Sequence, residues 1–309
     1  MSSMILMDAG SSGSLVWRCI VKDMRPFLPR FLKEIPYVQR LAHSARGQAF
    51  RHRLALHLED RRQYTFTQFF RLPSQLDALT GPVLDFLNAR RGSDPIRIVV
   101  IGCSTGAEPY TLSSVMLDRC PTLPITIDGY DIDESVLAVA RDATYGADEV
   151  LGNTLVSSDF VTKTFDRRDG NLFEVTPRVA QRVQFHQADF VRGTVLQDIP
   201  AADIVFAQNV MCNLRRPAAA RLFNNAVALM KPRSALFVDG MDLDMREERT
   251  RSHRLVPLTF ELERIHDEAR VVRGERYPWY AAGLEPFSPK HRNCDRRYST
   301  IFLRGAEPL

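Results

Sequence analysis

Apolar residues follow two alternating patterns between residues 96 and 239. A mostly apolar run rich in β-branched residues, typical of a buried strand, occurs at 96–101, and further strand candidates lie at 125–130, 183–187, 202–207 and 235–239. Segments in which apolar residues recur every three to four positions, typical of helices, lie among them at 108–117, 134–144 and 217–230. Strands that alternate with helices predict an α/β fold with a parallel, doubly wound sheet and right-handed crossovers.

The chain before residue 96 has a helical pattern instead. Apolar residues recur at three to four positions from 26 to 60 and again from 75 to 88, where Gly81-Pro82 interrupts the spacing. We therefore expect an N-terminal helical cap over 24–92. Residues 1–23 lack the basic start and the apolar run of a signal peptide, so we expect a disordered tail, or a start at the methionine at position 24.

The remainder, 93–309, is expected to form a Rossmann-like domain with two additions. Residues 153–182 break the strand–helix alternation with a polar turn, which predicts a small inserted subdomain. Residues 241–297 carry a charged segment, a helical pattern at 258–271 and an aromatic loop, which we interpret as a lid over the substrate. The last strand is predicted at 298–303.

The composition is that of a globular protein, because 45% of the 309 residues are hydrophobic and 25% are charged. The net charge of +4 comes from 41 basic and 37 acidic residues that are interspersed, so no nucleic-acid partner is expected. Five cysteines without a C-x-x-C pair indicate neither a disulfide framework nor a zinc site, and we expect no metal. This cysteine usage suits the reducing cytoplasm, and we expect no stable membrane insertion.

The first predicted strand runs into a glycine-rich turn, Gly102-Cys103-Ser104-Thr105-Gly106, which is followed by Glu108. In an open parallel sheet the ligand sits beyond the carboxyl ends of the strands, and the first strand-to-helix turn contacts it. The G-x-x-x-G spacing is not that of a pyrophosphate site, and no lysine occurs from 88 to 160. A phosphate-rich ligand is therefore disfavoured at this turn.

Acidic residues follow the predicted strands where such a ligand would bind. Glu108 lies in the first turn of a helix, Asp131 follows the second strand, and Asp189 follows the third with Phe190 beside it. Carboxylates at successive strand ends without a phosphate cradle indicate a positively charged nucleoside, S-adenosylmethionine (SAM). Taken singly, each acid is better explained as a helix N-cap, and Asp131 or Asp133 is suited to cap the helix at 134. Their combination with the glycines favours the cofactor.

Four sequence blocks point to a known family. They are TFTQFFR at 65–71, GCSTGAEPYTL at 102–112, YDIDESVLAVAR at 130–141 and FAQNVMCNL at 206–214. The blocks and their order resemble those of CheR-type methyltransferases, which methyl-esterify glutamates of bacterial chemotaxis receptors with SAM. The resemblance implies a class I SAM-methyltransferase fold and a SAM-dependent O-methyltransferase activity.

The glycine turn and the resemblance together give a predicted cofactor-binding set. Its members are Thr65, Thr67, Arg71, Gly102, Ser104, Gly106, Glu108, Asp131, Ile132, Asp189, Phe190, Gln208 and Asn209. By resemblance, Arg71 is the catalytic residue, close to the transferred methyl group and the methionine carboxylate. The chain also departs from the family, which has a tyrosine at the position of Asn213, an arginine at Gln208 and usually a histidine near Gln75.

The missing tyrosine does not exclude methyl transfer to a carboxylate. Methyl transfer from a sulfonium is an in-line displacement, and a carboxylate with a pKa of about 4 is already ionised at neutral pH. An alcohol or phenol would need a general base, and none is evident in these blocks, since the histidine at 186 is more typical of a structural role. The chemistry therefore favours a carboxylate acceptor.

The C-terminal segment suggests which carboxylic acid is the methyl acceptor. LTFELERIHDEARVV at 258–272 and RYPWYAAGLEPF at 276–287 resemble a divergent branch of the family, associated with 3-hydroxy fatty acid methyl esters that serve as quorum-sensing signals. This resemblance implies a lipid-like carboxylic acid as substrate, either free or as a thioester on an acyl carrier protein. The predicted substrate pocket consists of Asn213, Tyr277, Trp279 and Tyr280. The apolar residues of this segment equally suit a satellite core.

Three other functions remain open. Methylation of a protein glutamate would use the basic inserted subdomain as a docking surface, although its charges equally suit a solvated face; they are Lys163, Arg167, Arg168, Arg178 and Arg182. The absent tyrosine and arginine suggest a non-catalytic SAM-binding regulator. Nucleic-acid methylation ranks last, because the basic runs contain acids and AQNV lacks an aromatic base pocket.

Overall fold

The computed structural model describes residues 67–88, 94–193, 196–277, 279 and 284–307. The chain divides into two units, Met1–Glu59 and Asp60–Leu309, and every described residue belongs to the second. The expected tail and most of the expected helical cap therefore lie outside the described residues. Within the described residues, none of the helices has both the length and the apolar character needed to span a membrane.

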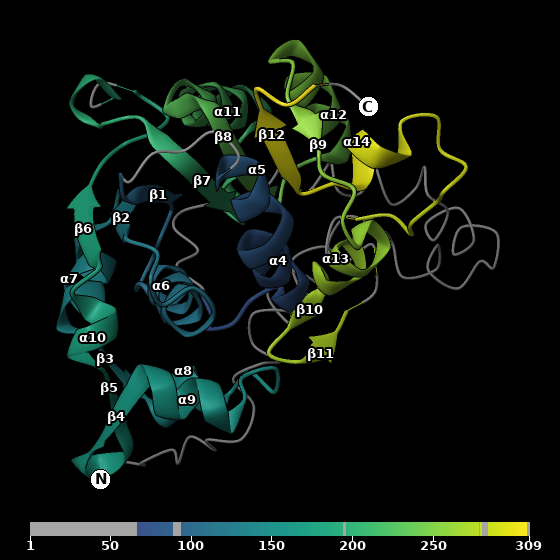
Figure 1. The fold of residues 1–309 in the computed structure, drawn as a ribbon. Coiled ribbons are helices and arrows are strands. Elements are labelled where there is room, and N and C mark those ends of the chain that lie inside the picture. The colour runs from purple at the N-terminus through teal and green to yellow at the C-terminus, as the bar shows by residue number, and fades with distance from the viewer. Residues whose placement is uncertain (1–66, 89–93, 194–195, 278, 280–283, 308–309) are drawn as a thin grey trace, which may run out of the picture. The chain divides into compact units, whose positions relative to one another are not determined.

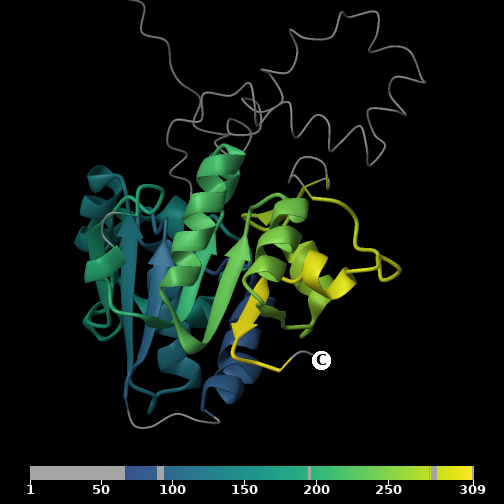
Figure 2. The same ribbon diagram turned by 90° about the horizontal axis from the view of Figure 1, so that it is seen from above.

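A central sheet of seven strands organises the second unit (Figure 1). Five neighbouring strands run parallel, as predicted: β6 (Val183–Gln187), β2 (Ile125–Asp131), β1 (Ile96–Ile101), β7 (Ala202–Gln208) and β8 (Met230–Asp239). Beyond β8 the sheet continues with β12 (Ile301–Arg304), which is antiparallel to β8, and β9 (Val256–Pro257), which is antiparallel to β12. Figure 2 shows the yellow β12 beside β8 at this edge. The α/β, doubly wound prediction is confirmed.

Alternate residues of β1 contact two separate hydrophobic cores. Ile96, Ile98 and Val100 join the first core, whereas Val99 and Ile101 join the second. This follows from the strand, in which successive side chains point to opposite faces. Because both faces are buried, the strand is apolar on both faces apart from the half-buried Arg97.

Helices cover both faces of the sheet (Figure 1). The first core includes α6 (Ala107–Arg119) and the segment α4 (Pro73–Ala78), η2 (Leu79–Val83) and α5 (Leu84–Asn88). The predicted interruption at Gly81-Pro82 is confirmed, since Gly81 has φ −111° and ψ −109° within η2. The second core includes α11 (Arg216–Ala228) and Met245 of α12 (Leu243–Ser252).

A small antiparallel sheet follows α7 (Glu134–Asp142) and precedes β6. Its order is β3-β5-β4, with β3 at Thr144–Gly146, β4 at Phe165–Arg168 and β5 at Leu172–Val175. Short helices accompany it: α8 (Ala147–Leu151), α9 (Ser158–Thr164), η3 (Asp169–Asn171) and α10 (Pro177–Ala180). The helix predicted to reach residue 144 ends at Asp142, because Ala143 takes the left-handed conformation (φ 55°) and the chain turns into β3.

The C-terminal segment departs most from the predicted boundaries. The helix predicted over 258–271 is α13 (Leu262–Glu268) alone, and two two-residue strands follow it, β10 (Val271–Val272) and β11 (Glu275–Arg276). Tyr298 ends the helix α14 (Cys294–Tyr298) instead of beginning the last strand, because its hydroxyl donates to Glu285 at 2.9 Å. Two further 3-10 turns are η4 (Leu196–Asp198) and η5 (Met211–Asn213).

Candidate functional site

The turn after β1 requires its two glycines. Gly102 and Gly106 have φ of 72° and 87°, in the left-handed region that side chains other than glycine rarely adopt. A Cβ atom on Gly102 would lie 2.9 Å from Cγ2 of Val210, and one on Gly106 would lie 2.9 Å from Cζ of Phe185. The glycines therefore let Phe185 of β6 and Val210, which follows β7, approach the turn closely.

Asp131 and Asp133 have different roles. Asp133 caps α7, accepting hydrogen bonds from the backbone N–H of Ser135 at 2.9 Å and from its hydroxyl at 2.6 Å. Asp131 accepts from the N–H of Ser104 at 2.9 Å, and so joins the end of β2 to the glycine turn. The capping alternative thus holds for Asp133 and not for Asp131. Ile132, between them, is 54% exposed at the same edge.

Asp189 and Phe190 lie beyond the next strand, β6. Oδ1 of Asp189 accepts from the N–H groups of Val191 and Arg192, at 2.9 and 3.0 Å, and so closes a local turn. Phe190 is buried with its ring edge-on to Tyr130, the centroids 5.5 Å apart. Asp131 and Asp189 are thus at the ends of adjacent strands, as predicted.

Two departures from the CheR pattern contact each other. The Gln208 side-chain amide, at the end of β7, donates to Oε1 of Gln75 on α4. Gln75 in turn donates to Thr300 at 2.6 Å. Gln208, where the resemblance implies an arginine, thus forms a buried, hydrogen-bonded pair with Gln75. The neutral pair links α4 to the sheet without a charge.

Asn209 and Asn213 form the turn after β7. Asn209 has φ 53°, and its N–H donates to the carbonyl of Asp239 at 3.0 Å. The side-chain amide of Asn213 donates to the carbonyl of Asn209 at 3.2 Å. Asn213 thus supports the turn locally at this edge of the sheet.

Arg71 lies in a strained segment before α4. Phe70 and Leu72 on either side have φ of 55° and 49°, a conformation that side chains with a Cβ rarely adopt. The segment is fixed by hydrogen bonds from the Phe70 N–H to the Thr111 hydroxyl at 3.1 Å and from the Asn153 amide to the Phe69 carbonyl at 2.8 Å. Strain that is held in place by such contacts is common at functional sites.

Three charged groups act on one another at this edge. Burial raises the pKa of Glu108 to about 7, with Arg71 opposing the rise and Asp239 adding to it. Burial lowers the pKa of Arg71, opposed by Glu108, Asp239 and Cys212. Burial also raises the pKa of Asp239, opposed by Arg246 and Arg71. Arg71 and Glu108 nevertheless keep some exposed surface, through which a ligand can reach them.

Asp239 and Arg246 were not predicted from the sequence. Asp239 ends β8 just as Asp131 ends β2, so an acid after an apolar run was the available signal. Arg246 lies on α12 and is fully buried, with Nη1 3.8 Å from Oδ1 of Asp239. Its charged surroundings in the sequence gave no indication of burial.

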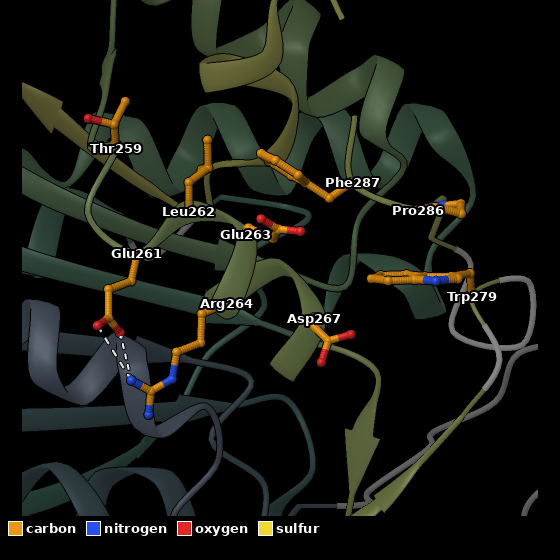
Figure 3. A pocket seen from close by; sticks show the side chains of 9 residues that line it. All are labelled: Thr259, Glu261, Leu262, Glu263, Arg264, Asp267, Trp279, Pro286 and Phe287. Carbon is orange, nitrogen blue, oxygen red and sulfur yellow. Dashed lines mark hydrogen bonds and ion pairs between the residues drawn. The ribbon is translucent and has the colours of Figure 1, made fainter. Parts of the chain in front are cut away.

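A cavity of about 740 Å³ adjoins α13 (Figure 3). Apolar side chains of Leu262, Trp279 and Phe287 line it together with Thr259, Glu261, Glu263, Arg264, Asp267 and Pro286. Arg264 is paired with Glu261 at 3.1 Å, as the dashed lines in Figure 3 indicate, and with Glu268 at 3.4 Å.

The structure does not bring all of the predicted site residues together. Trp279 borders the cavity, Tyr277 is absent from the described lining, and Asn213 is in the turn after β7. Thr67 is half-buried near the start of the Arg71 segment. Thr65 and Tyr280 lie outside the described residues.

Comparison with known proteins agrees with the sequence blocks. The family model described as "CheR methyltransferase, SAM binding domain" matches residues 65–257. The probable biofilm formation methyltransferase WspC of Pseudomonas putida is 30% identical over 173 residues, which cover 56% of this chain and 40% of that protein. Chemotaxis protein methyltransferase 2 of Vibrio cholerae is 30% identical over 148 residues, covering 47% of this chain and 50% of that protein.

The chain matches half or less of the length of these two relatives. Among solved structures, magnesium protoporphyrin IX methyltransferase from Synechocystis with bound SAH is 15% identical, with a TM-score of 0.31 and coverage of 65% of this chain and 71% of that one. The fold assignment accordingly rests on the strand order above, and the family assignment on the sequence match. Because the matched region spans more than half of the chain, the protein belongs to the CheR methyltransferase family and contains its SAM-binding domain.

Proposed function

We propose that this protein is a SAM-dependent carboxyl O-methyltransferase. The observation that carries the proposal is the group formed by Arg71, Glu108 and Asp239, at the edge where a parallel sheet binds its ligand. Two carboxylates, those of Glu108 and Asp239, act on the Arg71 guanidinium. Such a site suits an acceptor that is already ionised and needs no general base.

The residues at this edge suit a sulfonium nucleoside. Gly102 and Gly106 let the first turn pack closely against Val210 and Phe185, and the Asp131 carboxylate lies beside the turn. Glu108, in the first turn of α6, would repel a phosphate and attract a cation. SAM, when bound, supplies an electrophilic methyl group whose transfer to a carboxylate oxygen forms an ester and leaves a neutral thioether.

Each residue then has a defined task. Asp131 holds the ribose hydroxyls, and Glu108 balances the positive charge of the methionine end. Arg71 orients carboxylates, because its planar guanidinium binds them with two parallel hydrogen bonds. With the acceptor ionised, the protein contributes positioning and exclusion of water rather than proton transfer.

The acceptor in this proposal is the free carboxylate of a 3-hydroxy fatty acid, because a carrier thioester has no carboxylate oxygen to receive the methyl group. Leu262, Trp279 and Phe287 give the cavity an apolar wall, and each buried methylene would contribute about 0.8 kcal/mol. The lining carboxylates would repel an acid head group, so the tail enters the cavity and the head faces Arg71. Hydrogen bonds join α13, which borders the cavity, to α4, which follows Arg71. Glu268 of α13 accepts from the Ser74 hydroxyl at 2.7 Å and from the Ser74 N–H at 2.9 Å. Leu262 lies about 9 Å further along α13.

The test is incubation of the purified protein with methyl-labelled SAM and 3-hydroxy fatty acids of several chain lengths. We expect a base-labile methyl ester, detected by mass spectrometry, with a preference for long chains. Leu262→Glu should remove the chain-length preference while SAM binding is retained. If the free acids yield no ester, this substrate assignment is wrong.

Methylation of a protein glutamate is the second candidate. The names of the two relatives, a chemotaxis protein methyltransferase and a biofilm formation methyltransferase, favour it. Against it, basic residues of the small sheet are paired within the chain: Lys163 with Asp118 and Asp159, each at 2.7 Å, and Arg168 with Glu174. Label transferred from SAM to receptor-enriched membranes, and released by base, would select this candidate over the fatty acid.

A further inference from the structure

The segment that carries Arg71 is held at both ends by residues from beyond the family match. At its beginning, Oε1 of Gln68 accepts from the N–H of Arg273 at 2.9 Å. At its end, Glu268 accepts from the hydroxyl of Ser74 at 2.7 Å and from its N–H at 2.9 Å. The match with the family model ends at residue 257, so both contacts come from the later part of the chain, which we call the C-terminal addition.

Glu268 supplies a cap that α4 lacks. The N-cap residue of α4 is Leu72, whose side chain cannot accept a hydrogen bond, and Pro73, the first residue of the helix, has no N–H. The N–H of Ser74 is therefore the first that α4 presents, at a position where no carbonyl of the same helix can accept it. Glu268 accepts it instead, so a carboxylate of α13 caps α4 from outside.

The pair of Ser74 and Glu268 is shielded from water. Ser74 has no exposed surface, and the side chain of Glu268 is 15% exposed. The Nε of Arg264, 3.4 Å away, balances part of the charge of Glu268. Hydrogen bonds to a carboxylate in such surroundings are strong. Without the carboxylate, the N–H and hydroxyl of Ser74 would be buried with no acceptor, so the start of α4 would have to move.

Backbone strain makes the Arg71 segment depend on these bonds. Phe70 and Leu72, on either side of Arg71, both have left-handed conformations, which persist only where the surrounding structure holds them. The middle of the segment is held from α6, because the N–H of Phe70 donates to Thr111 at 3.1 Å. If the bonds to Glu268 were lost, Leu72 could relax, and the backbone of Arg71 would shift with it.

We propose that Glu268 is a positioning residue for the reaction: by capping α4 it holds the backbone of Arg71 at the edge of the sheet. The C-terminal addition is then part of the catalytic unit and not only a cover over it. The helix that carries Glu268, α13, also borders the cavity, so it serves both the substrate tail and the Arg71 segment. The inference rests on the proposed function for the role of Arg71, and deepens it.

Calorimetric SAM affinity of matched variants tests this proposal. Glu268→Leu should weaken SAM binding by about tenfold or more, because a displaced Arg71 no longer orients the methionine carboxylate. Glu268→Gln should stay within about threefold of the wild type, since its amide can accept from the N–H of Ser74 and donate to the hydroxyl. The control is Glu247→Leu on α12, whose carboxylate is 14% exposed and pairs with Arg251 at 2.9 Å; it should bind SAM like the wild type.

Melting temperature and hydrogen exchange separate positioning from folding. Glu268→Leu and Glu247→Leu each remove one mostly buried carboxylate, so we expect similar losses in melting temperature. Only Glu268→Leu should speed exchange at the N–H groups of Phe70 and Ser74, which donate to side chains of other elements. If Glu268→Leu binds SAM like the wild type, or if both variants lose affinity alike, Glu268 has only a structural role and the proposal is wrong.

Ser74→Ala decides the question should Glu268→Leu not fold. This variant loses the hydroxyl bond to Glu268 and keeps the N–H bond, so the start of α4 is loosened without leaving a buried carboxylate unpaired. We expect SAM affinity to fall by about threefold and exchange at the Ser74 N–H to become faster. Unchanged affinity and exchange would overturn the proposal.

The outcomes for SAM binding and for ester formation are independent. The predicted affinity pattern without any methyl ester would contradict the substrate proposal and leave the role of Glu268 standing. Ester formation by Glu268→Leu with the rate and SAM affinity of the wild type would do the reverse. A wild-type protein that binds no SAM would overturn both.

Discussion

Charged residues of similar types occur at the edge of the large sheet and on the small antiparallel sheet, in opposite environments. At the large sheet, the side chains of Asp239 and Arg246 are 4% and 0% exposed. On the small sheet, Arg168 and Glu174 are 56% and 40% exposed, and they still form an ion pair. In the sequence both regions are merely charged, so burial alone distinguishes them.

The difference in exposure changes both the free-energy contribution of the charges and their effect on ligand binding. Exposed pairs contribute about 0 to 1 kcal/mol, because water and salt screen them. Buried charges lose their hydration, which shifts their pKa values and makes each partner depend on the others. The edge of the large sheet is therefore where a change of one charge should alter ligand binding, and the small sheet is where it should not.

The largest contrast is expected from Arg71→Ala. It should reduce ester formation by about 100-fold or more, because an oriented, charge-assisted contact to carboxylates is lost. Initial rates with labelled SAM measure this. Arg168→Ala is the matched arginine on the small sheet, and its rate should stay within about twofold of the wild type. Similar losses in both variants would remove the functional distinction between the two regions.

Glu108→Gln should give the next largest effect, on stability against pH. The folded-state pKa of Glu108 is about 7, above its ordinary 4.5, so the folded protein holds a proton that the unfolded chain releases between these values. The wild type therefore loses stability as pH rises through this window. The glutamine variant does not titrate, and should be more stable than the wild type by roughly 1 to 3 kcal/mol above pH 7 and equal to it near pH 4.5.

Urea unfolding at pH 4.5, 6 and 8 measures the difference between the two proteins. A stability difference that does not change with pH would contradict the buried-carboxylate account. SAM affinity gives a second readout, which should change with pH in the opposite direction to stability. In the wild type the affinity should fall below pH 7, because Glu108 gains a proton and no longer attracts a cation. The glutamine variant should bind weakly at every pH in this range.

The sequence predicted the large-sheet edge better than any other part. β1 needed a mostly apolar run because both of its faces are buried, and the left-handed turn after it needed glycine, so both left clear signals. Asp131 could be placed by its position after a strand. The sequence could not show which of Asp131 and Asp133 caps the helix, because the two acids differ only in the direction of their side chains.

Contacts between distant segments are what the sequence could not supply. The bond between Gln75 and Gln208 joins residues 133 positions apart, and the pair of Asp239 and Arg246 depends on how α12 packs against β8. The same holds for Tyr298, which ends a helix because Glu285 accepts its hydroxyl, although its aromatic character favours a strand. Such tertiary contacts override local preferences.

The smallest effect is expected from Lys163→Gln combined with Arg168→Gln on the small sheet. Lys163 is 44% exposed, and its bonds to Asp118 and Asp159 raise its pKa without burial. Stability in urea should therefore stay close to that of the wild type, and any change should vanish at high salt. Fatty acid methylation should be unaffected. If the double variant instead loses label transfer to receptor-enriched membranes while keeping SAM affinity, these exposed charges form a docking surface. The large-sheet edge would then bind the cofactor, and the small sheet would bind the protein partner.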